Sequence, residues 1–460
     1  MKSFFKLITA VLMFLITAIV CVAQEITGSW SGKLNAAQGI SLELIFNVSA
    51  NPDGSLSATL DSPQEGVRGL AMDSASYENG TLTIESARLS MTYKGMYLMG
   101  VLNGTFTQRG MNLPLALSKV KITKPRRPQT PVGPFPYSEE EVSFMNEREG
   151  FKLSGTLTMP KEGKDLHAVV LVSGSGAQNR DEELYDHKPF AVIADYLTRS
   201  GLAVLRVDDR GVGASEGDRT YATTIDFMYD AEAAIDYLFS RPEIAEVSVL
   251  GHSEGGLITY MIAEHRKDIK SIVSLAGPAV SGHDVLIEQT RAALRAQGVP
   301  DAVIEQSMSL NSQIYDFVVE TKDLPLEEYS VKLIAKLRQL LGPGVDDQQI
   351  AQTASQIDNE WMRFFINYDP SNAIRNVDCP LLFINGTKDC QVISAQNVPA
   401  MKKLTAGKTN VQIEELEGLN HILQEAKTGA VQEYYEIEQT ISPKALSLIV
   451  EVLGSRGQTP

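Results

Sequence analysis

One serine of the chain stands between two glycines, in the stretch Gly251-His252-Ser253-Glu254-Gly255. The stretch Val247-Ser248-Val249-Leu250 before it is typical of a buried strand, and residues 256–260 after it are compatible with a helix. A turn this tight from strand to helix accepts only small neighbours and leaves the serine Oγ projecting above the sheet. The helix N-terminus below favours negative charge there. The pattern therefore predicts that Ser253 is a nucleophile.

A serine hydroxyl is a weak nucleophile and needs a general base, which by chain order should follow it. The chain has six histidines, and five are unsuited by position. Two precede the serine, one is adjacent and points elsewhere on the turn, one lies too far along the next helix, and one falls in a predicted insertion (His167, His187, His252, His265 and His283). His421 alone follows the last predicted strand, on a loop that would reach over the sheet. It is the predicted general base.

The acid that orients this base should follow the preceding strand of the sheet. Asp389 comes just after the apolar run 381–384, whereas Asp378 and Asp369 precede that run and belong to the wrong edge of the sheet. We predict Asp389 as the acid, and the competing interpretation is a turn-capping aspartate.

Acyl transfer also needs N–H donors for a tetrahedral oxyanion. One predicted donor is the backbone N–H of Glu254, the residue after the nucleophile. The second should come from the loop 173–176, where the Ser175 N–H is preferred and Gly176 is the alternative. The Glu254 side chain is expected to be packed or solvated rather than catalytic.

The stretch Asp209-Arg210-Gly211-Val212-Gly213 superficially resembles a dinucleotide-binding loop. Its glycine spacing is wrong and no helix follows at once, so a structural turn closed by an Asp–Arg contact is favoured. The chain has no zinc-ligand spacing and no glycine-rich phosphate loop. No metal and no cofactor are expected.

These residues need a parallel sheet to position them. From about residue 140, two leading strands (141–147 and 152–159) are followed by apolar strands that alternate with helices, which predicts a mostly parallel, doubly wound sheet covered on both faces. Residues 281–368 break the alternation with helical segments and are predicted to form a cap over the strand ends. The predicted catalytic domain spans residues 138–460.

Residues 24–119 show short alternating runs separated by turns, as expected for a small β-barrel or sandwich. They contain no histidine, so an accessory or interaction module is the favoured interpretation and a ligand-holding barrel the alternative. Residues 120–137 carry five prolines and are predicted to form a semi-rigid linker.

Residues 1–23 have a charged start, an apolar run and a small residue at Ala23, the pattern of a signal peptide. Export to the periplasm or medium is expected, and lipoprotein anchoring at Cys21 is the less favoured alternative. Cleavage would leave Cys379 and Cys390 at opposite ends of one strand. Mostly extended chain would hold them about 20–35 Å apart, so both are expected to be free thiols.

The formal net charge is −16, and an acidic surface repels phosphate backbones. Nucleic acid is therefore not an expected partner. The apolar run near the start is short for a membrane span, and the expected partner is a small-molecule ester. The sequence does not determine the oligomeric state.

Residues 140–455 resemble the α/β-hydrolase superfamily, and most closely two-domain bacterial carboxylesterases of the serine aminopeptidase and dienelactone hydrolase-like branch. The matching pieces are 174–181, 209–215, 251–255, 386–389 and Asn420-His421. Where many members have His-Gly in the first oxyanion loop, this chain has Ser173-Gly174. The resemblance implies hydrolysis of short-chain acyl esters through an acyl-enzyme, without a metal.

Two alternatives to this function stay open. A serine peptidase would need paired carboxylates in the cap, for which Glu327-Glu328 and Asp346-Asp347 are candidates. A non-catalytic binding protein would act through the β-domain, although the set Ser253, Asp389 and His421 argues against it.

Overall fold

The computed structural model describes residues 26–35, 41–65, 67–121, 125–296 and 298–454. The chain divides into two compact units, Met1–Lys124 and Pro125–Pro460. The predicted signal peptide, residues 1–23, lies outside the described residues.

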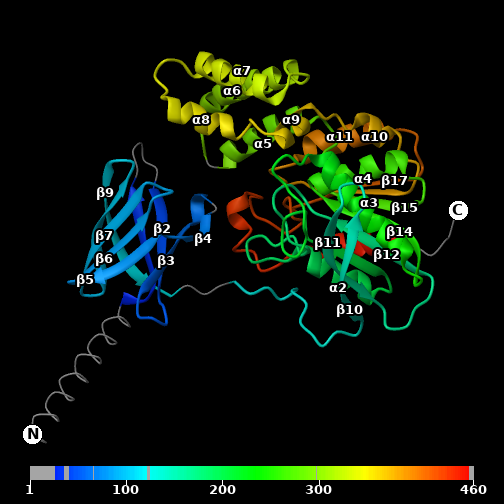
Figure 1. The fold of residues 1–460 in the computed structure, drawn as a ribbon, viewed down its shortest axis with the longest axis horizontal. Coiled ribbons are helices and arrows are strands. Elements are labelled where there is room, and N and C mark those ends of the chain that lie inside the picture. The colour runs from blue at the N-terminus through cyan, green and yellow to red at the C-terminus, as the bar shows by residue number, and fades with distance from the viewer. Residues whose placement is uncertain (1–25, 36–40, 66, 122–124, 297, 455–460) are drawn as a thin grey trace, which may run out of the picture. The chain divides into compact units, whose positions relative to one another are not determined.

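The amino-terminal unit is an antiparallel β-barrel (Figure 1). Its strands are β1 (Gly28–Asn35), β2 (Ser41–Ala50), β3 (Leu56–Ser62), β4 (Val67–Ala71), β5 (Ser74–Glu78), β6 (Thr81–Ser86), β7 (Met91–Leu98), β8 (Val101–Gln108) and β9 (Met111–Val120). The order runs β2-β1-β9-β8-β7-β6-β5-β3, and β2 pairs with β3 to close the ring. β4 pairs with β3 outside this ring. Of the two expected forms, barrel and sandwich, the structure is the barrel.

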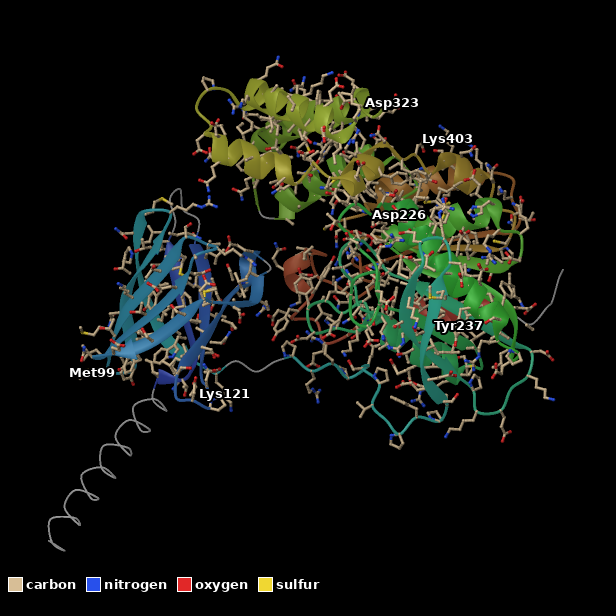
Figure 2. The ribbon with its side chains drawn as sticks, viewed as in Figure 1. Met99, Lys121, Asp226, Tyr237, Asp323 and Lys403 are labelled. Carbon is tan, nitrogen blue, oxygen red and sulfur yellow. The ribbon has the colours of Figure 1, made fainter. Side chains whose placement is uncertain are left out.

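Alternation along the barrel strands sends every second side chain inward. The interior is filled by large rings, including Trp30, Phe46 and Tyr93, which are wholly buried. Met99, in the turn between β7 and β8, points away from this core and is 95% exposed (Figure 2).

The carboxyl-terminal unit is built on an eight-stranded mixed sheet of order β10-β11-β13-β12-β14-β15-β16-β17. The strands are β10 (Ser138–Asn146), β11 (Phe151–Met159), β12 (Leu166–Val172), β13 (Ala203–Val207), β14 (Ile244–His252), β15 (Ile269–Leu275), β16 (Leu381–Gly386) and β17 (Val411–Leu416). The first two strands are antiparallel, and the strands from β13 to β17 are parallel. This is the α/β-hydrolase fold that the sequence predicted.

Helices cover both faces of the sheet because successive strand residues face opposite ways. Val169 and Leu171 of β12 pack with α2 (Pro189–Arg199) and α12 (Pro443–Gly454). Their neighbours Ala168 and Val170 pack on the other face with α3 (Thr224–Ser240), α4 (Glu254–His265) and α11 (Ser394–Leu404).

The segment between β15 and β16 forms a helical layer beyond α4 (Figure 1). Its helices are α5 (Gly282–Ala296), α6 (Asp301–Glu320), α7 (Leu326–Leu341), α8 (Asp347–Ser355), α9 (Glu360–Asn367) and α10 (Ser371–Arg375). Tyr329, Leu333 and Leu337 of α7 are fully buried in the layer's own apolar core. Helices α5 to α9 thus occupy the region expected to be a cap.

The proline-rich segment after residue 124 is fastened to the carboxyl-terminal unit. Arg127 donates hydrogen bonds to the backbone carbonyls of Tyr185, Tyr435 and Ile437, at 2.7–3.2 Å. The Gln129 side chain donates a hydrogen bond to the Ile441 carbonyl and accepts one from the Ile441 N–H. Of the predicted linker, residues 125–137 therefore belong to this unit, and residues up to Val120 belong to β9.

In the described part of the chain, no helix combines the length and apolarity needed to cross a membrane. Cys379 and Cys390 are both free thiols.

Candidate active site

Ser253 occupies the sharp turn between β14 and α4, with φ 55° and ψ −118°. A non-glycine residue with positive φ is strained, and such strain is typical of a nucleophile elbow. The turn leaves no room for a side chain at the glycine on either side of Ser253. A Cβ on Gly251 would lie 2.0 Å from the Gly255 carbonyl oxygen, and one on Gly255 would lie 2.0 Å from that of Val172.

The turn lies where the strand order reverses. β12 has β13 on one side and β14 on the other, so the carboxyl ends of β12 and β14 form a topological switch point. Ligand sites of open α/β sheets lie at such points.

The structure brings Ser253, His421 and Asp389 together from segments far apart in the sequence. The Ser253 hydroxyl lies 3.1 Å from Nε2 of His421, and Nδ1 of His421 lies 2.9 Å from Oδ2 of Asp389. Because a carboxylate only accepts, Nδ1 carries the proton and the lone pair of Nε2 faces the serine. This is the hydrogen-bond order of a Ser-His-Asp triad.

Asp389 is buried and held in place by three donors besides His421. Its Oδ1 accepts from the backbone N–H groups of Gln391 and Val392, at 2.8 and 2.9 Å. Its Oδ2 accepts from the Asn385 amide at 3.0 Å. The two backbone donors hold the carboxylate in one orientation, with Oδ2 facing the imidazole.

The acids set aside in the sequence lie apart from the triad. Asp378 is exposed and paired with Lys267 at 2.8 Å, and Asp369 accepts a bond from the Ser371 N–H.

Within the described part of the chain, no intramolecular acceptor is found for the backbone N–H groups of the two predicted oxyanion donors. Glu254 is the first residue of α4, whose first N–H groups have no partner within the helix. In the other loop, Gly174 donates its N–H to Glu182 at 2.7 Å, whereas the N–H of the exposed Ser175 has no acceptor among the residues that the structure describes. Gly174 itself lies against Ser253, since a Cβ there would be 3.1 Å from Cβ of Ser253.

The side chain of Glu254, the residue after Ser253, is buried. Its Oε1 accepts hydrogen bonds from the Thr224 hydroxyl at 2.6 Å and the Trp361 indole at 2.7 Å. Burial raises the pKa of Glu254 to about 7, against the opposing effect of these two bonds. Trp361 belongs to α9, so this carboxyl links the elbow to the helical layer.

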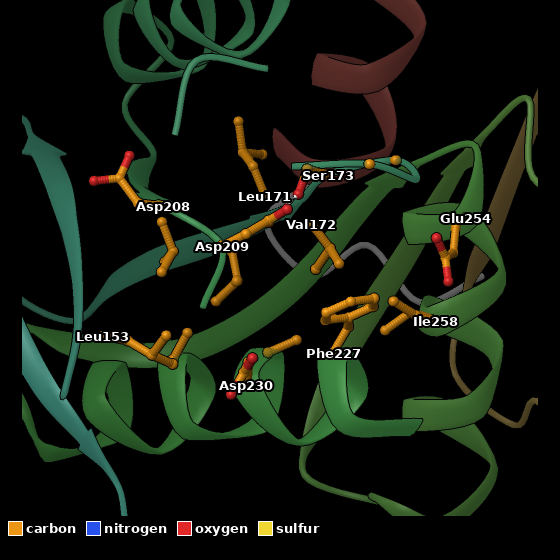
Figure 3. A pocket seen from close by; sticks show the side chains of 16 residues that line it. Leu153, Leu171, Val172, Ser173, Asp208, Asp209, Phe227, Asp230, Glu254 and Ile258 are labelled. Atoms are coloured by element: carbon orange, nitrogen blue, oxygen red, sulfur yellow. Dashed lines mark hydrogen bonds between the residues drawn. The ribbon is translucent and has the colours of Figure 1, made fainter. Parts of the chain in front are cut away.

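A cavity of about 50 Å³ opens beside the elbow (Figure 3). Its polar lining includes Ser173, Glu254 and the aspartates Asp208, Asp209 and Asp230, and apolar side chains such as Phe227 and Ile258 line it as well. Asp209 accepts from the Ser173 hydroxyl at 2.6 Å, and burial raises its pKa.

Sequence reasoning missed the role of His252, which it placed as pointing elsewhere on the turn. Its Nδ1 lies 2.9 Å from Glu182, and its Nε2 lies 3.0 Å from the backbone carbonyl of His421. Nothing in the sequence marks Glu182 as buried, because its position depends on which loops meet.

The turn after β13 is structural, but its ion pairs differ from a simple Asp–Arg closure. Asp209 pairs with Arg219, which lies beyond the turn, and Asp208 pairs with Arg180. Arg210 is buried and binds Glu149 and Asp230 instead.

Comparison with protein families gives a match over residues 185–340 to the family described as "Serine aminopeptidase, S33". The chain is 27% identical over 292 residues to the esterase EstD of Thermotoga maritima, which covers 64% of this chain and 61% of that protein. It is 26% identical over 144 residues to the cutinase est1 of Thermobifida alba, covering 31% and 45%. The chain thus spans less than two thirds of the length of these relatives.

Among solved structures, an esterase of Pyrococcus furiosus is 18% identical and aligns with a TM-score of 0.42, covering 73% of this chain and 98% of that one. The strand order of the eight-stranded sheet by itself establishes the fold of this unit.

Proposed function

Taking the carboxyl-terminal unit as a member of the α/β-hydrolase superfamily, we propose that the protein is a serine esterase. Ser253 is the nucleophile, His421 the general base, Asp389 the acid that orients it, and the N–H groups of Ser175 and Glu254 bind the oxyanion. The observation that carries the proposal is the continuous hydrogen-bond chain from Ser253 through His421 to Asp389.

The reaction follows from the positions of the protons. The Ser253 Oγ attacks the ester carbonyl carbon as Nε2 of His421 takes the hydroxyl proton. The oxyanion collapses, the alcohol leaves with that proton, and an acyl-enzyme remains on Oγ. A water then loses a proton to Nε2 and attacks the acyl carbon, and the return of the proton to Oγ releases the acid.

We propose short-chain acyl esters as substrates, as the resemblance to bacterial carboxylesterases implies. The cavity beside the elbow has apolar side chains such as Phe227 and Ile258 in its lining. Nitrophenyl acetate should be cleaved with a higher kcat/KM than nitrophenyl decanoate, and a preference for the long chain would contradict this assignment.

A fluorophosphonate probe, which labels activated serines covalently, tests the activity itself. The wild-type protein should be labelled and Ser253→Ala should not. Absence of labelling in the wild type would favour the alternative of a non-catalytic binding protein. Equal labelling of Ser253→Ala would refute Ser253 as the nucleophile.

A serine peptidase is the second candidate, favoured by the name of the matching family. Three of the four cap carboxylates that it would need are engaged at the surface. Glu328 pairs with Lys332 on α7, and Asp347 pairs with Arg338 while 86% exposed. Asp346 caps α8 by accepting from the Gln349 N–H. Aminoacyl-anilides should therefore be poor substrates beside nitrophenyl esters.

We further propose that residues 1–23 direct export of the protein. Cell fractionation of the full chain should place a product beginning near Gln24 in the periplasm or medium. A product acylated at Cys21 would instead identify a lipoprotein.

A further inference from the structure

Two loops that carry predicted catalytic groups meet at one buried pair of side chains, Glu182 and His252. Glu182 is 2% exposed, and its Oε1 accepts both the Gly174 N–H at 2.7 Å and a proton of His252 Nδ1 at 2.9 Å. On the other side of its ring, His252 Nε2 lies 3.0 Å from the backbone carbonyl of His421. The pair thus joins the loop after β12 to the loop that carries the base.

The two partners of His252 define its protonation state. A carboxylate and a carbonyl both only accept, so each ring nitrogen must carry a proton to form both bonds. A neutral imidazole has only one N–H and would lose the hydrogen bond to one of the two loops. An imidazolium paired with the Glu182 carboxylate satisfies both bonds at once.

The surroundings agree with this charge. Burial by itself lowers the pKa of His252, but the Glu182 carboxylate beside it, and the more distant Asp389, raise it above its ordinary value. The other titratable group that faces the ring is His421, whose ring centroid lies 4.8 Å away. The space next to the ring is a cavity of only about 10 Å³ with largely apolar walls, too small for more than a single water to replace a lost bond.

We propose that Glu182 and His252 are positioning residues that hold the oxyanion loop and the base loop in register around Ser253. The proposal rests on the esterase function proposed above. Neither residue exchanges a proton with the substrate. Glu182 fixes Gly174, the neighbour of the predicted donor Ser175, and His252 fixes the backbone of the base.

Ester-hydrolysis kinetics of Glu182→Gln, His252→Gln and the double variant test the proposal. Each single variant should lower kcat about 10- to 100-fold with little change in KM, because displacing a reacting group by about 1 Å has an effect of this size. The double variant should be little worse than the more damaging single one, since the pair acts as a unit.

The matched control is the surface pair His265 and Glu232, joined at 2.6 Å at the far end of α4. His265→Gln and Glu232→Gln should keep wild-type kinetics. If folded Glu182→Gln and His252→Gln variants also keep kcat within twofold of the wild type, the proposal is wrong.

The pH dependence of kcat provides a readout that a purely structural role would not move, and it needs no variant. The rate of the wild type should fall on the alkaline side as His252 loses its proton and releases the His421 loop. A kcat that stays level through the alkaline range would overturn the proposal even if every variant failed to fold. Failure of the esterase function is separate, because it would appear as an inactive, unlabelled wild type.

Discussion

Replacing Asp389 by asparagine exchanges one carboxylate oxygen for an NH₂ group and should nearly abolish turnover. The backbone N–H groups of Gln391 and Val392 both point at Oδ1, so the amide oxygen of the new side chain must stay at that position. Its NH₂ group then occupies the place of Oδ2 and faces Nδ1 of His421. The imidazole responds by accepting at Nδ1 and carrying its proton on Nε2.

That tautomer points an N–H, not a lone pair, at the hydroxyl of Ser253, so the base cannot take the proton. The forming imidazolium also loses the carboxylate that stabilises it. The same substitution in a serine protease triad lowers kcat about 10⁴-fold, which corresponds to about 5.5 kcal/mol of transition-state stabilisation. We expect a loss of about 10³- to 10⁴-fold here.

The assay is the release of nitrophenolate from nitrophenyl acetate, with the rate of fluorophosphonate labelling as a second measure. The matched control is Asp378→Asn, an exposed aspartate before β16 that should behave as the wild type. Thermal unfolding of Asp389→Asn should stay cooperative because the side chain keeps its size. A folded Asp389→Asn protein with more than a tenth of the wild-type kcat would refute the reasoning.

Three further substitutions test the packing around the site. Glu254→Gln keeps an oxygen for the Thr224 and Trp361 donors but cannot ionise. Because the pKa of Glu254 in the folded state is raised from 4.5 to about 7, the free energy of unfolding of the wild type falls as pH rises through this interval. Above pH 7, the variant should exceed the wild type by up to about 3 kcal/mol in denaturant unfolding. An unchanged pH dependence of unfolding would contradict this. Gly255→Ala places a Cβ 2.0 Å from the Val172 carbonyl oxygen, so it should lower the free energy of unfolding by about 1–3 kcal/mol and remove most of the fluorophosphonate labelling. The control Gly344→Ala meets no atom within 4 Å and should have no effect. Equal melting temperatures of the two variants would count against a tightly packed elbow. Arg210→Ala leaves Asp230 buried without its cation and should lower the free energy of unfolding by about 3–5 kcal/mol. Lys267→Ala, at the exposed pair with Asp378, should lower it by at most about 1 kcal/mol. Similar losses for the two variants would show that burial does not determine the effect.

The sequence was sufficient where local pattern and chain order determine position. Apolar strands that alternate with helices led to the mixed sheet, and the strand ends located Ser253, Asp389 and His421 at one edge, where the structure brings them together. Strand alternation could not show that β2 pairs with β3, so barrel and sandwich stayed equivalent until the ring closed.

The sequence could not predict the contacts between distant loops. Glu182 and His252 are 70 positions apart, and His252 and His421 are 169 apart, so no periodicity connects them. The link from Trp361 to Glu254 spans 107 positions and depends on how the helical layer lies over α4. Such contacts follow from the tertiary fold. A polar side chain needs a partner when it is buried, and its burial is known only from the structure.

The attachment of residues 125–137 determines how the two units can be separated by protein engineering. Gln129 bonds the backbone of Thr440 and Ile441, the neighbouring Gln439 carbonyl accepts from Gln424, and Gln424 bonds Asn420, next to His421. A shortened chain that begins at Ser138 would remove the first support of this series, whereas one that begins at Pro125 would keep it. Any exchange of the barrel for another domain should therefore join its new partner ahead of Pro125.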